Sequence, residues 1–209
     1  MRVLVACEFS GRVRDAFRQC GHTAVSADIL PSETPGEHYQ GDVRDIMSDG
    51  WDLMIAHPPC TYLANSGVSW LYKDESRWNK LDSAASFFLE LWNAPIKKIC
   101  IENPIMHKHG RERIGNLQYT QIIQPWQFGH PESKATCLWL KNLPALHPTN
   151  NVKDEMEALP KNQRHRMHFL PPSETRWMER SRTYQGIADA MAKQWGNVHT
   201  PITRQAVLV

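Results

Sequence analysis

The sequence predicts one α/β domain with a mostly parallel sheet, on three observations. Short apolar runs typical of buried strands alternate along the chain with stretches whose apolar residues recur at helical spacing. Four of the strand-like runs end at residues capable of chemistry, namely Glu8, Asp28, Cys60 and Glu102. The chain has 209 residues, 41% of them hydrophobic, which is enough for one well-buried domain and too little for two large ones. Ligands of such sheets bind beyond the carboxyl ends of the strands, so we expect the functional site there.

In the first half of the chain, the pattern predicts three strands and one helix. Gly21 is suited to ending the helix, and the two prolines before Cys60 stop the third strand abruptly. Residues 30–40 contain two prolines and a glycine and are expected to form a loop, as are the aromatic and polar residues 61–80. The expected elements are strands at 3–6, 23–27 and 51–56, a helix at 13–19, and a turn with a short helix at 41–46.

The second half predicts a clear helix, further strands and a closing helix. The expected elements are a helix at 83–92, strands at 99–101, 120–124 and 136–140, and a helix at 184–195. Residues 142–183 are rich in proline, asparagine and charge, with a basic cluster at Lys161, Arg164, His165 and Arg166. We therefore expect a single domain over 1–209, with a small insertion at 142–183, a closing helix at 184–196 and a terminal tail.

Composition narrows the functional classes. The formal net charge is +2, so any charge that binds nucleic acid must be local. The five cysteines form no CxxC pair, so we expect no metal site and no redox pair. Their odd number and the lack of a signal peptide predict a reducing, cytoplasmic location. No apolar stretch approaches the roughly 20 residues of a membrane span, and we expect no membrane partner. No feature indicates an oligomeric state.

A nucleophile and an acid follow neighbouring strands of the expected sheet. Cys60 comes after two prolines on a stiff backbone, although a buried, inert cysteine is the commoner explanation of that tripeptide alone. Glu102 starts the sequence Glu-Asn-Pro after the next strand. A thiolate that adds to C6 of cytosine, with a carboxyl group at N3, activates C5 to take a methyl group from a sulfonium. This chemistry predicts a lowered pKa for the Cys60 thiol and a raised pKa for Glu102.

The first strand, the first helix and the next two turns predict a cofactor site. A small-residue turn joins the first strand to the helix, where backbone approaches a ligand closely. Asp28 is placed to accept hydrogen bonds from ribose hydroxyls, and Asp42 to meet an adenine amino group. No GxGxxG or GK[ST] motif occurs, which favours a cofactor with ribose and adenine but no diphosphate. The candidate cofactor-binding residues here are Glu8, Phe9, Ser10, Gly11, Asp28, Ile29, Asp42 and Val43.

In their common order, these motifs resemble those of the DNA cytosine-5 methyltransferases, most closely the small phage or prophage type. The matching segments are CEFSG at 7–11, Asp28, Gly41-Asp42, PPC at 58–60, ENP at 102–104, FGHPESKAT at 128–136 and GIADA at 186–190. The resemblance covers most of residues 1–140 and again 182–196. It implies a Rossmann-like class I S-adenosylmethionine-dependent methyltransferase sheet, S-adenosyl-L-methionine as cofactor, and Cys60 and Glu102 as catalytic residues. It also adds Pro58 and Ala188 to the cofactor site, because the closing helix returns to that pocket in the family.

The chain departs from the family pattern at three places. An arginine expected to hold the base is replaced by Thr136, so Lys134 is the candidate third catalytic residue. His57 stands where a glycine usually precedes the PPC tripeptide, and it narrows the space beside Cys60. The large target-recognition domain is missing, and only the roughly 40 residues of 142–183 take its place. We expect a short or relaxed recognition sequence.

The expected partner is double-stranded DNA with the target base flipped into the pocket. Two groups of side chains are candidates to contact it: Tyr62, Asn65, Ser66, Trp70 and Tyr72 after Cys60, and Lys161, Arg164, Arg166, Arg176, Arg180 and Arg182 in the insertion. A free pyrimidine nucleotide is an alternative substrate, and a catalytically silent, cofactor-binding DNA-binding module is an alternative of another class. An amino-methyltransferase is disfavoured because the strand ends in HPPC rather than Asp/Asn-Pro-Pro-aromatic.

Overall fold

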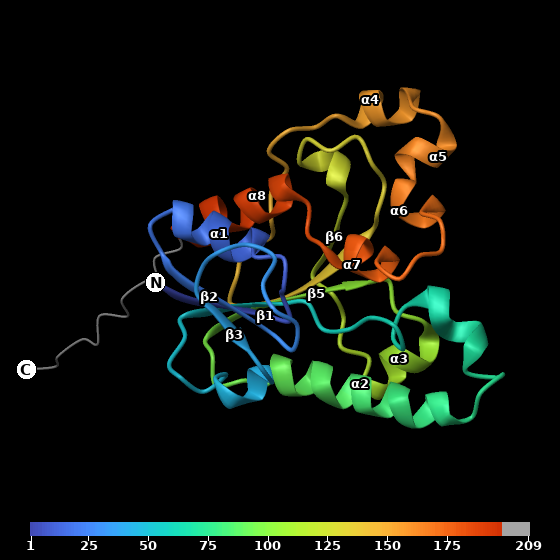
Figure 1. Ribbon diagram of the computed structural model, residues 1–209, viewed down its shortest axis with the longest axis horizontal. Coiled ribbons are helices and arrows are strands. Elements are labelled where there is room, and N and C mark those ends of the chain that lie inside the picture. Colours follow the sequence, from blue (N-terminus) through green and yellow to red (C-terminus); the bar gives the residue numbers. More distant parts are fainter. Residues whose placement is uncertain (198–209) are drawn as a thin grey trace, which may run out of the picture.

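A seven-stranded sheet forms the centre of the molecule in the computed structural model, which describes residues 1–197 (Figure 1). The strand order is β3-β2-β1-β4-β5-β7-β6. Strands β1 to β5 run parallel, and β7 is antiparallel to both of its neighbours, β5 and β6. The strands are β1 Arg2–Ala6, β2 Thr23–Asp28, β3 His38–Gln40, β4 Leu53–Ala56, β5 Lys98–Pro104, β6 Gln121–Ile123 and β7 Thr136–Lys141. The predicted Rossmann-like α/β fold with a mostly parallel sheet is confirmed.

Helices cover both faces of the sheet (Figure 1). Helices α1 (Arg12–Gln19) and α8 (Gln185–Trp195) pack together on one face, and α2 (Ser76–Trp92) and α3 (Lys108–Arg113) lie on the other. Because successive strand residues point to opposite faces, Val3 and Val5 pack under α1 and α8, whereas Leu4 packs toward α2. Burial of the strands on both faces explains why they appear in the sequence as continuous apolar runs.

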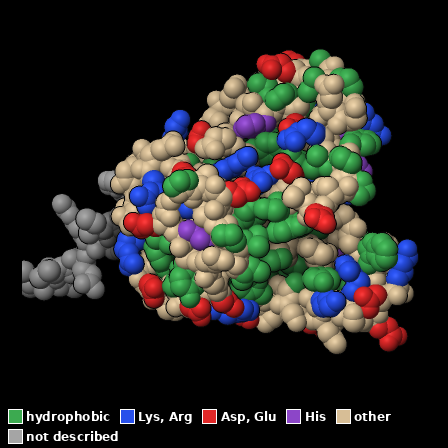
Figure 2. All heavy atoms as spheres, in the orientation of Figure 1, with side chains coloured by type: hydrophobic (Ala, Val, Ile, Leu, Met, Phe, Trp, Pro, Cys, Tyr) green, Lys and Arg blue, Asp and Glu red, His purple; other side chains and the backbone are tan. Residues whose placement is uncertain are grey.

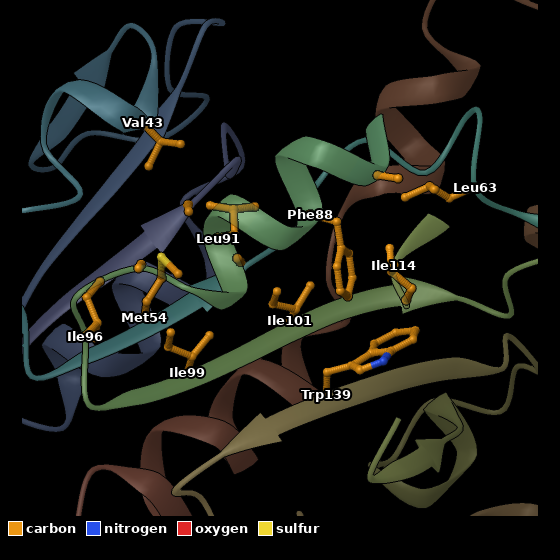
Figure 3. Packing of buried hydrophobic residues seen from close by; sticks show 14 of the residues in the cluster. Val43, Met54, Leu63, Phe88, Leu91, Ile96, Ile99, Ile101, Ile114 and Trp139 are labelled. Carbon is orange, nitrogen blue, oxygen red and sulfur yellow. The ribbon is translucent and has the colours of Figure 1, made fainter. Parts of the chain in front are cut away.

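Buried side chains beneath α2 pack the sheet against its helix layer (Figure 3). Phe88 of α2 points toward β5 beside Ile101, Leu91 belongs to the same buried cluster, and the ring of Phe88 meets Trp139 of β7 edge-on at 5.2 Å between centroids. All four side chains are almost fully buried. This layer anchors β5, the strand that carries Glu102.

Residues 142–183, the predicted insertion, contain four short helices in a lobe at the upper right of Figure 1. Its first residues pack on the main core instead: Leu146 is buried there, and Trp195 of α8 donates a hydrogen bond to the carbonyl of Pro144 at 3.0 Å. The helices are α4 Lys153–Ala158, α5 Lys161–Arg164, α6 Arg166–Phe169 and α7 Arg176–Ser181. No helix within residues 1–197 combines the length and the apolar character needed to cross a bilayer.

Several predicted boundaries are wrong. The expected loop at 30–40 ends in β3, whose three residues extend the edge of the sheet by pairing with β2. Helix α2 begins at Ser76, not at residue 83, because its first two turns are polar and largely exposed and give no apolar periodicity. Helix α3 was not predicted for the same reason. The predicted tail lies mostly outside the described residues.

Replacing Trp195 by alanine is expected to lower the free energy of unfolding by about 3–5 kcal/mol. Its side chain is fully buried between α8 and the sheet, and the truncation also removes its hydrogen bond to Pro144. Urea denaturation followed by circular dichroism measures the change. Trp70→Ala is the matched control, because Trp70 is 53% exposed and its loss is expected to change the free energy by no more than about 0.5 kcal/mol.

Candidate active site

The carboxyl ends of β1, β4 and β5 bring together residues that are far apart in the sequence. Ala56 of β4 lies opposite Ile101 of β5 in the parallel register, so the next residues, His57 and Glu102, come side by side. The amide of His57 donates to the carbonyl of Ala6, which continues the ladder toward β1. The site predicted at this edge of the sheet therefore starts from a backbone arrangement that the strand register sets.

His57 and Glu102 form an ion pair at the bottom of the site. His57 Nδ1 donates to Glu102 Oε2 at 2.7 Å, and the two side chains are only 10% and 14% exposed. Burial lowers the pKa of His57, but the carboxylate of Glu102 outweighs it and raises that pKa overall. Burial likewise raises the pKa of Glu102, but the imidazolium outweighs it and lowers that pKa. The prediction of a raised Glu102 pKa is therefore wrong, because His57 stabilises the carboxylate.

The pH dependence of stability follows from the two directions. The lowered pKa of Glu102 stabilises the fold above its ordinary value of 4.5, and this is lost as pH falls through the folded-state pKa. The raised pKa of His57 stabilises the fold fully below 6.5, and this is lost as pH rises through its folded-state pKa. The difference in unfolding free energy between the wild type and Glu102→Gln is thus expected to be greatest between pH 4.5 and 6.5. Urea denaturation across pH measures it, and a flat difference would contradict the ion pair.

The PPC turn is held rigidly next to this pair. The carbonyl of Cys60 accepts hydrogen bonds from the amides of Leu63 and Ala64 at 3.0 and 2.9 Å. Asn103, almost fully buried beside Glu102, donates from Nδ2 to the carbonyl of Pro58 at 3.2 Å. The ENP segment thus holds the PPC segment directly, a function for Asn103 that the sequence did not indicate.

The Cys60 thiol is partly buried, and burial raises its pKa. Lys134 lowers that pKa, while the carboxylate of Glu102 raises it. The expectation of a lowered pKa is wrong for this state of the site, because desolvation of the thiolate outweighs the nearby cations.

Lys134 lies at the centre of the predicted catalytic residues. Its charge is close enough to lower the pKa of Cys60, Glu102 and His57. Its Nζ donates to the carbonyl of Arg180 at 2.8 Å, which ties it to the α7 segment of the insertion. Thr136, which stands where the motif resemblance would place an arginine, is buried in β7. The structure thus brings Cys60, Glu102 and Lys134 together.

In the loop between β1 and α1, the carboxylate of Glu8 stabilises the turn by accepting hydrogen bonds. Glu8 is 4% exposed and accepts hydrogen bonds from the amides of Val13 and Arg14, at 2.7 and 3.2 Å, at the start of α1. Ser10 Oγ donates to the same carboxylate at 3.2 Å. Gly11 has φ 71°, and a Cβ there would lie 2.2 Å from Thr34 Oγ1. A side chain at position 11 would clash with Thr34, so this loop needs a glycine there to bring its backbone close to a ligand.

The predicted adenosine-side acids lie next along the sheet edge. Asp28 is partly exposed at the end of β2 and accepts from the amide of Leu30 at 3.0 Å. Asp42 forms an ion pair with Arg44 at 2.8 Å on the surface. Ile29 beside Asp28 is 75% exposed. Val43 is buried in the core, and Pro58 is buried in the PPC turn. These two residues would therefore contact a cofactor chiefly through backbone atoms.

Helix α8, the predicted closing helix, packs in the apolar core with α1. Ala188 is fully buried in the apolar core with Val13 and Phe17 of α1, where it presents no atom to a ligand. The structure does not bring Ala188 to the candidate cofactor pocket, because the close packing of α8 buries it, and its role there stays a prediction. That packing requires Gly186, where a Cβ would lie 1.9 Å from the carbonyl of Phe128.

A segment of the insertion covers the β1–α1 loop. Trp177 packs on Phe9 with ring centroids 6.1 Å apart, and Arg182 forms an ion pair with Glu33 at 2.5 Å. What remains open beneath is a pocket of about 40 Å³, lined by Cys7, Glu8, Phe9, Ser10, His57, Ser181 and Thr183. Known ligand pockets for small molecules measure roughly 300–1,000 Å³. Residues 177–183 would have to move for an adenosine-sized ligand to enter.

The residues after Cys60 are more ordered than the predicted loop. An isolated antiparallel β-bridge joins Ala64 to Met106, and His107 donates from Nε2 to the carbonyl of Tyr62 at 2.8 Å. Further on, Trp70 and Tyr72 are exposed, and Lys73 lies over the Trp70 ring at 4.8 Å. Exposed aromatic rings such as these suit stacking against bases, and Lys73 adds a cation beside one of them.

Five of the six predicted phosphate-binding cations divide into two groups, and the sixth, Arg164, is half-buried. Arg166 and Arg182 are engaged in ion pairs with Glu132 and Glu33, and Arg176 donates to the carbonyl of His168. Lys161 and Arg180 are exposed, and Arg180 is close enough to lower the pKa of Cys60. Figure 2 shows apolar side chains gathered between the lobe and the α2 layer, with Lys and Arg side chains on the lobe above them.

Comparison with known proteins identifies no family. No protein-family model matches the chain, and no curated protein matches it. Among solved structures, a candidate DNA modification methyltransferase encoded within an E. coli prophage has a TM-score of 0.47 at 16% identity, over 77% of this chain and 56% of that one. A co-crystal structure of WbdD with the kinase inhibitor LY294002 has a TM-score of 0.40 at 13% identity, over 69% and 37%. The chain thus spans between about a third and just over half of those structures, and such likenesses assign no activity.

Proposed function

We propose that this protein is an S-adenosylmethionine-dependent methyltransferase that acts on C5 of cytosine in DNA, with Cys60 as nucleophile. The observation that carries the proposal is the meeting of Cys60, Glu102 and Lys134 at one edge of the sheet, held there by strand register and by Asn103. A merely structural cysteine needs neither the acid nor the cation beside it. The fold is of the type that the motif resemblance implies.

The proposed reaction starts at C6 of the flipped base. The Cys60 thiol loses its proton, which Lys134 favours, and the sulfur bonds to C6 while the ring takes a proton at N3. The electron pair that reaches C5 accepts a methyl group. The C5 proton then leaves, the bond between Cys60 and C6 breaks, and N3 returns its proton, which restores the ring with a methyl group at C5. The bound cofactor supplies the methyl group on a sulfonium.

The proton for N3 is carried by His57 and Glu102 as a unit. Glu102 alone is ionised in this environment, but the pair retains one proton on its hydrogen bond. The shared proton passes from His57 Nδ1 to Glu102 and from Glu102 to N3, which leaves a neutral His57 and an ionised Glu102. This explains how a carboxylate with a lowered pKa can still serve as the acid.

The residues present suit the proposed cofactor in chemistry. Asp28 can accept from ribose hydroxyls, and the β1–α1 loop brings backbone close to the sheet edge. His57 lines the pocket, and its buried Nε2 has no hydrogen-bond partner within residues 1–197. Movement of residues 177–183 would open the space that the adenosine needs.

Incorporation of a labelled methyl group tests the function. The protein is incubated with S-adenosylmethionine carrying a labelled methyl group and with double-stranded DNA, single-stranded DNA or dCMP. Digestion to nucleosides and mass spectrometry are expected to show 5-methylcytosine from the double-stranded DNA. Product from dCMP alone would move the substrate to a free nucleotide, and binding of the cofactor without any product would favour the silent module.

A further inference from the structure

The imidazole of His57 connects two halves of the site. Its Nδ1 is hydrogen-bonded to Glu102 on the β5 side, and the residue also lines the pocket beneath the β1–α1 loop. The Nε2 atom is buried from solvent and has no hydrogen-bond partner within the described residues 1–197. A buried N–H without a partner costs free energy, so a site that keeps one is a candidate for a ligand that satisfies it.

The groups around Nε2 leave it free for an external acceptor. Glu8 lines the same pocket, but both its oxygens already accept from the first turn of α1 and from Ser10. Glu102 engages Nδ1, so Nε2 is the ring nitrogen of His57 that is left for a ligand. The carboxylate of Glu8 raises the pKa of His57, and the nearby charge of Lys134 lowers it. The hydrogen bond with Glu102 keeps the imidazole protonated, and a charged donor bonds most strongly to an anionic acceptor.

The strand order indicates which part of the proposed cofactor reaches this pocket. The adenosine-side acid Asp28 ends β2, whereas Cys60 and Glu102 belong to β4 and β5. A donor lying from one to the other crosses above β1 and β4, where the pocket and His57 are. Its amino-acid part is the part beyond the adenosine, and the only anionic group there is a carboxylate. The pocket there measures about 40 Å³, which suits a small end group of the donor and not its adenosine.

We propose that His57 Nε2 donates a hydrogen bond to the carboxylate of the bound S-adenosyl donor and so determines which donors bind. The proposal rests on the proposed function and deepens it. His57 would then be a specificity residue, because its one ring orients both the donor and Glu102. A glycine at this position, as in the pattern that the motifs resemble, could make neither contact.

Isothermal titration with two donors tests this contact. The probes are S-adenosylmethionine and its decarboxylated form, which keeps the adenosine and the sulfonium but lacks the carboxylate. The wild type is expected to bind S-adenosylmethionine more tightly by about tenfold or more, as for a hydrogen bond between charged groups. His57→Asn keeps a donor near the Nδ1 position and removes Nε2, so this preference is expected to shrink. His57→Gln places an amide near the Nε2 position and is expected to retain more of it.

The outcomes separate the two proposals. A wild type that binds neither donor overturns the proposed function. A wild type that binds S-adenosylmethionine, with the same preference in His57→Asn and His57→Gln, overturns the assignment of His57 alone. The ¹⁵N resonance of Nε2 in the wild type gives a second measurement that needs no variant: S-adenosylmethionine is expected to shift it, and an equal shift with the decarboxylated donor contradicts the contact.

Discussion

Cys60→Ala is expected to abolish covalent capture of a DNA duplex that contains 5-fluorocytosine. With fluorine at C5, the last step cannot release a proton, so the bond between the Cys60 sulfur and C6 stays in place after methyl transfer. The wild type, incubated with S-adenosylmethionine and this duplex, should therefore show a complex whose mass is the sum of protein, DNA and methyl group. Denaturing gel electrophoresis and mass spectrometry measure it.

The chain offers its own control for this experiment. Cys20 is exposed at the end of α1 and belongs to no part of the site, so Cys20→Ala should form the complex as the wild type does. Peptide mapping should place the adduct at Cys60. An adduct that persists in Cys60→Ala, or that maps to another cysteine, would rule out Cys60 as the nucleophile.

Glu102→Gln is expected to lower the rate of methyl transfer by about a hundredfold to ten-thousandfold, the usual contribution of general acid catalysis. The glutamine keeps the size of the side chain and can still accept from His57 Nδ1, but it cannot pass a proton to N3. Single-turnover measurements with excess enzyme report the chemical step. Donor affinity should change far less, because the pair meets the donor only through His57.

A matched control separates this effect from loss of charge in general. Glu112→Gln removes a carboxylate from the exposed end of α3, where the side chain is 45% exposed, and should leave the rate unchanged. Equal rates in the wild type and Glu102→Gln would mean that the proton reaches N3 from another group. Cys60 and Lys134 would then need a different acid.

The two proposals together assign His57 to both acid catalysis and donor binding. With a glycine before the PPC tripeptide, Glu102 would lack its imidazole partner, and desolvation in the buried site would raise its pKa. With His57 present, the acid is ionised and the proton is shared over the pair. The same ring reaches the donor pocket, so binding of the donor and readiness of the acid are linked through one side chain.

The amino-acid sequence by itself determined the layers of the fold and the candidates for chemistry. Strands buried on both faces, such as β1 and β4, are continuous apolar runs, and α8 is strongly periodic, so local pattern was sufficient for these elements. The PPC and ENP tripeptides stand at strand ends, so their order and position identified Cys60 and Glu102 without coordinates.

Only the tertiary structure decided how those candidates behave. The register of β4 against β5 places His57 beside Glu102, and that contact reverses the expected pKa of the acid. Burial of the Cys60 thiol depends on every neighbour that excludes water, and the seat of Ala188 depends on the packing of α8 against α1. β3, whose pattern is too short, became a strand only by pairing with β2. Residue types and spacing are local properties, whereas desolvation, strand register and helix packing arise from contacts between distant segments.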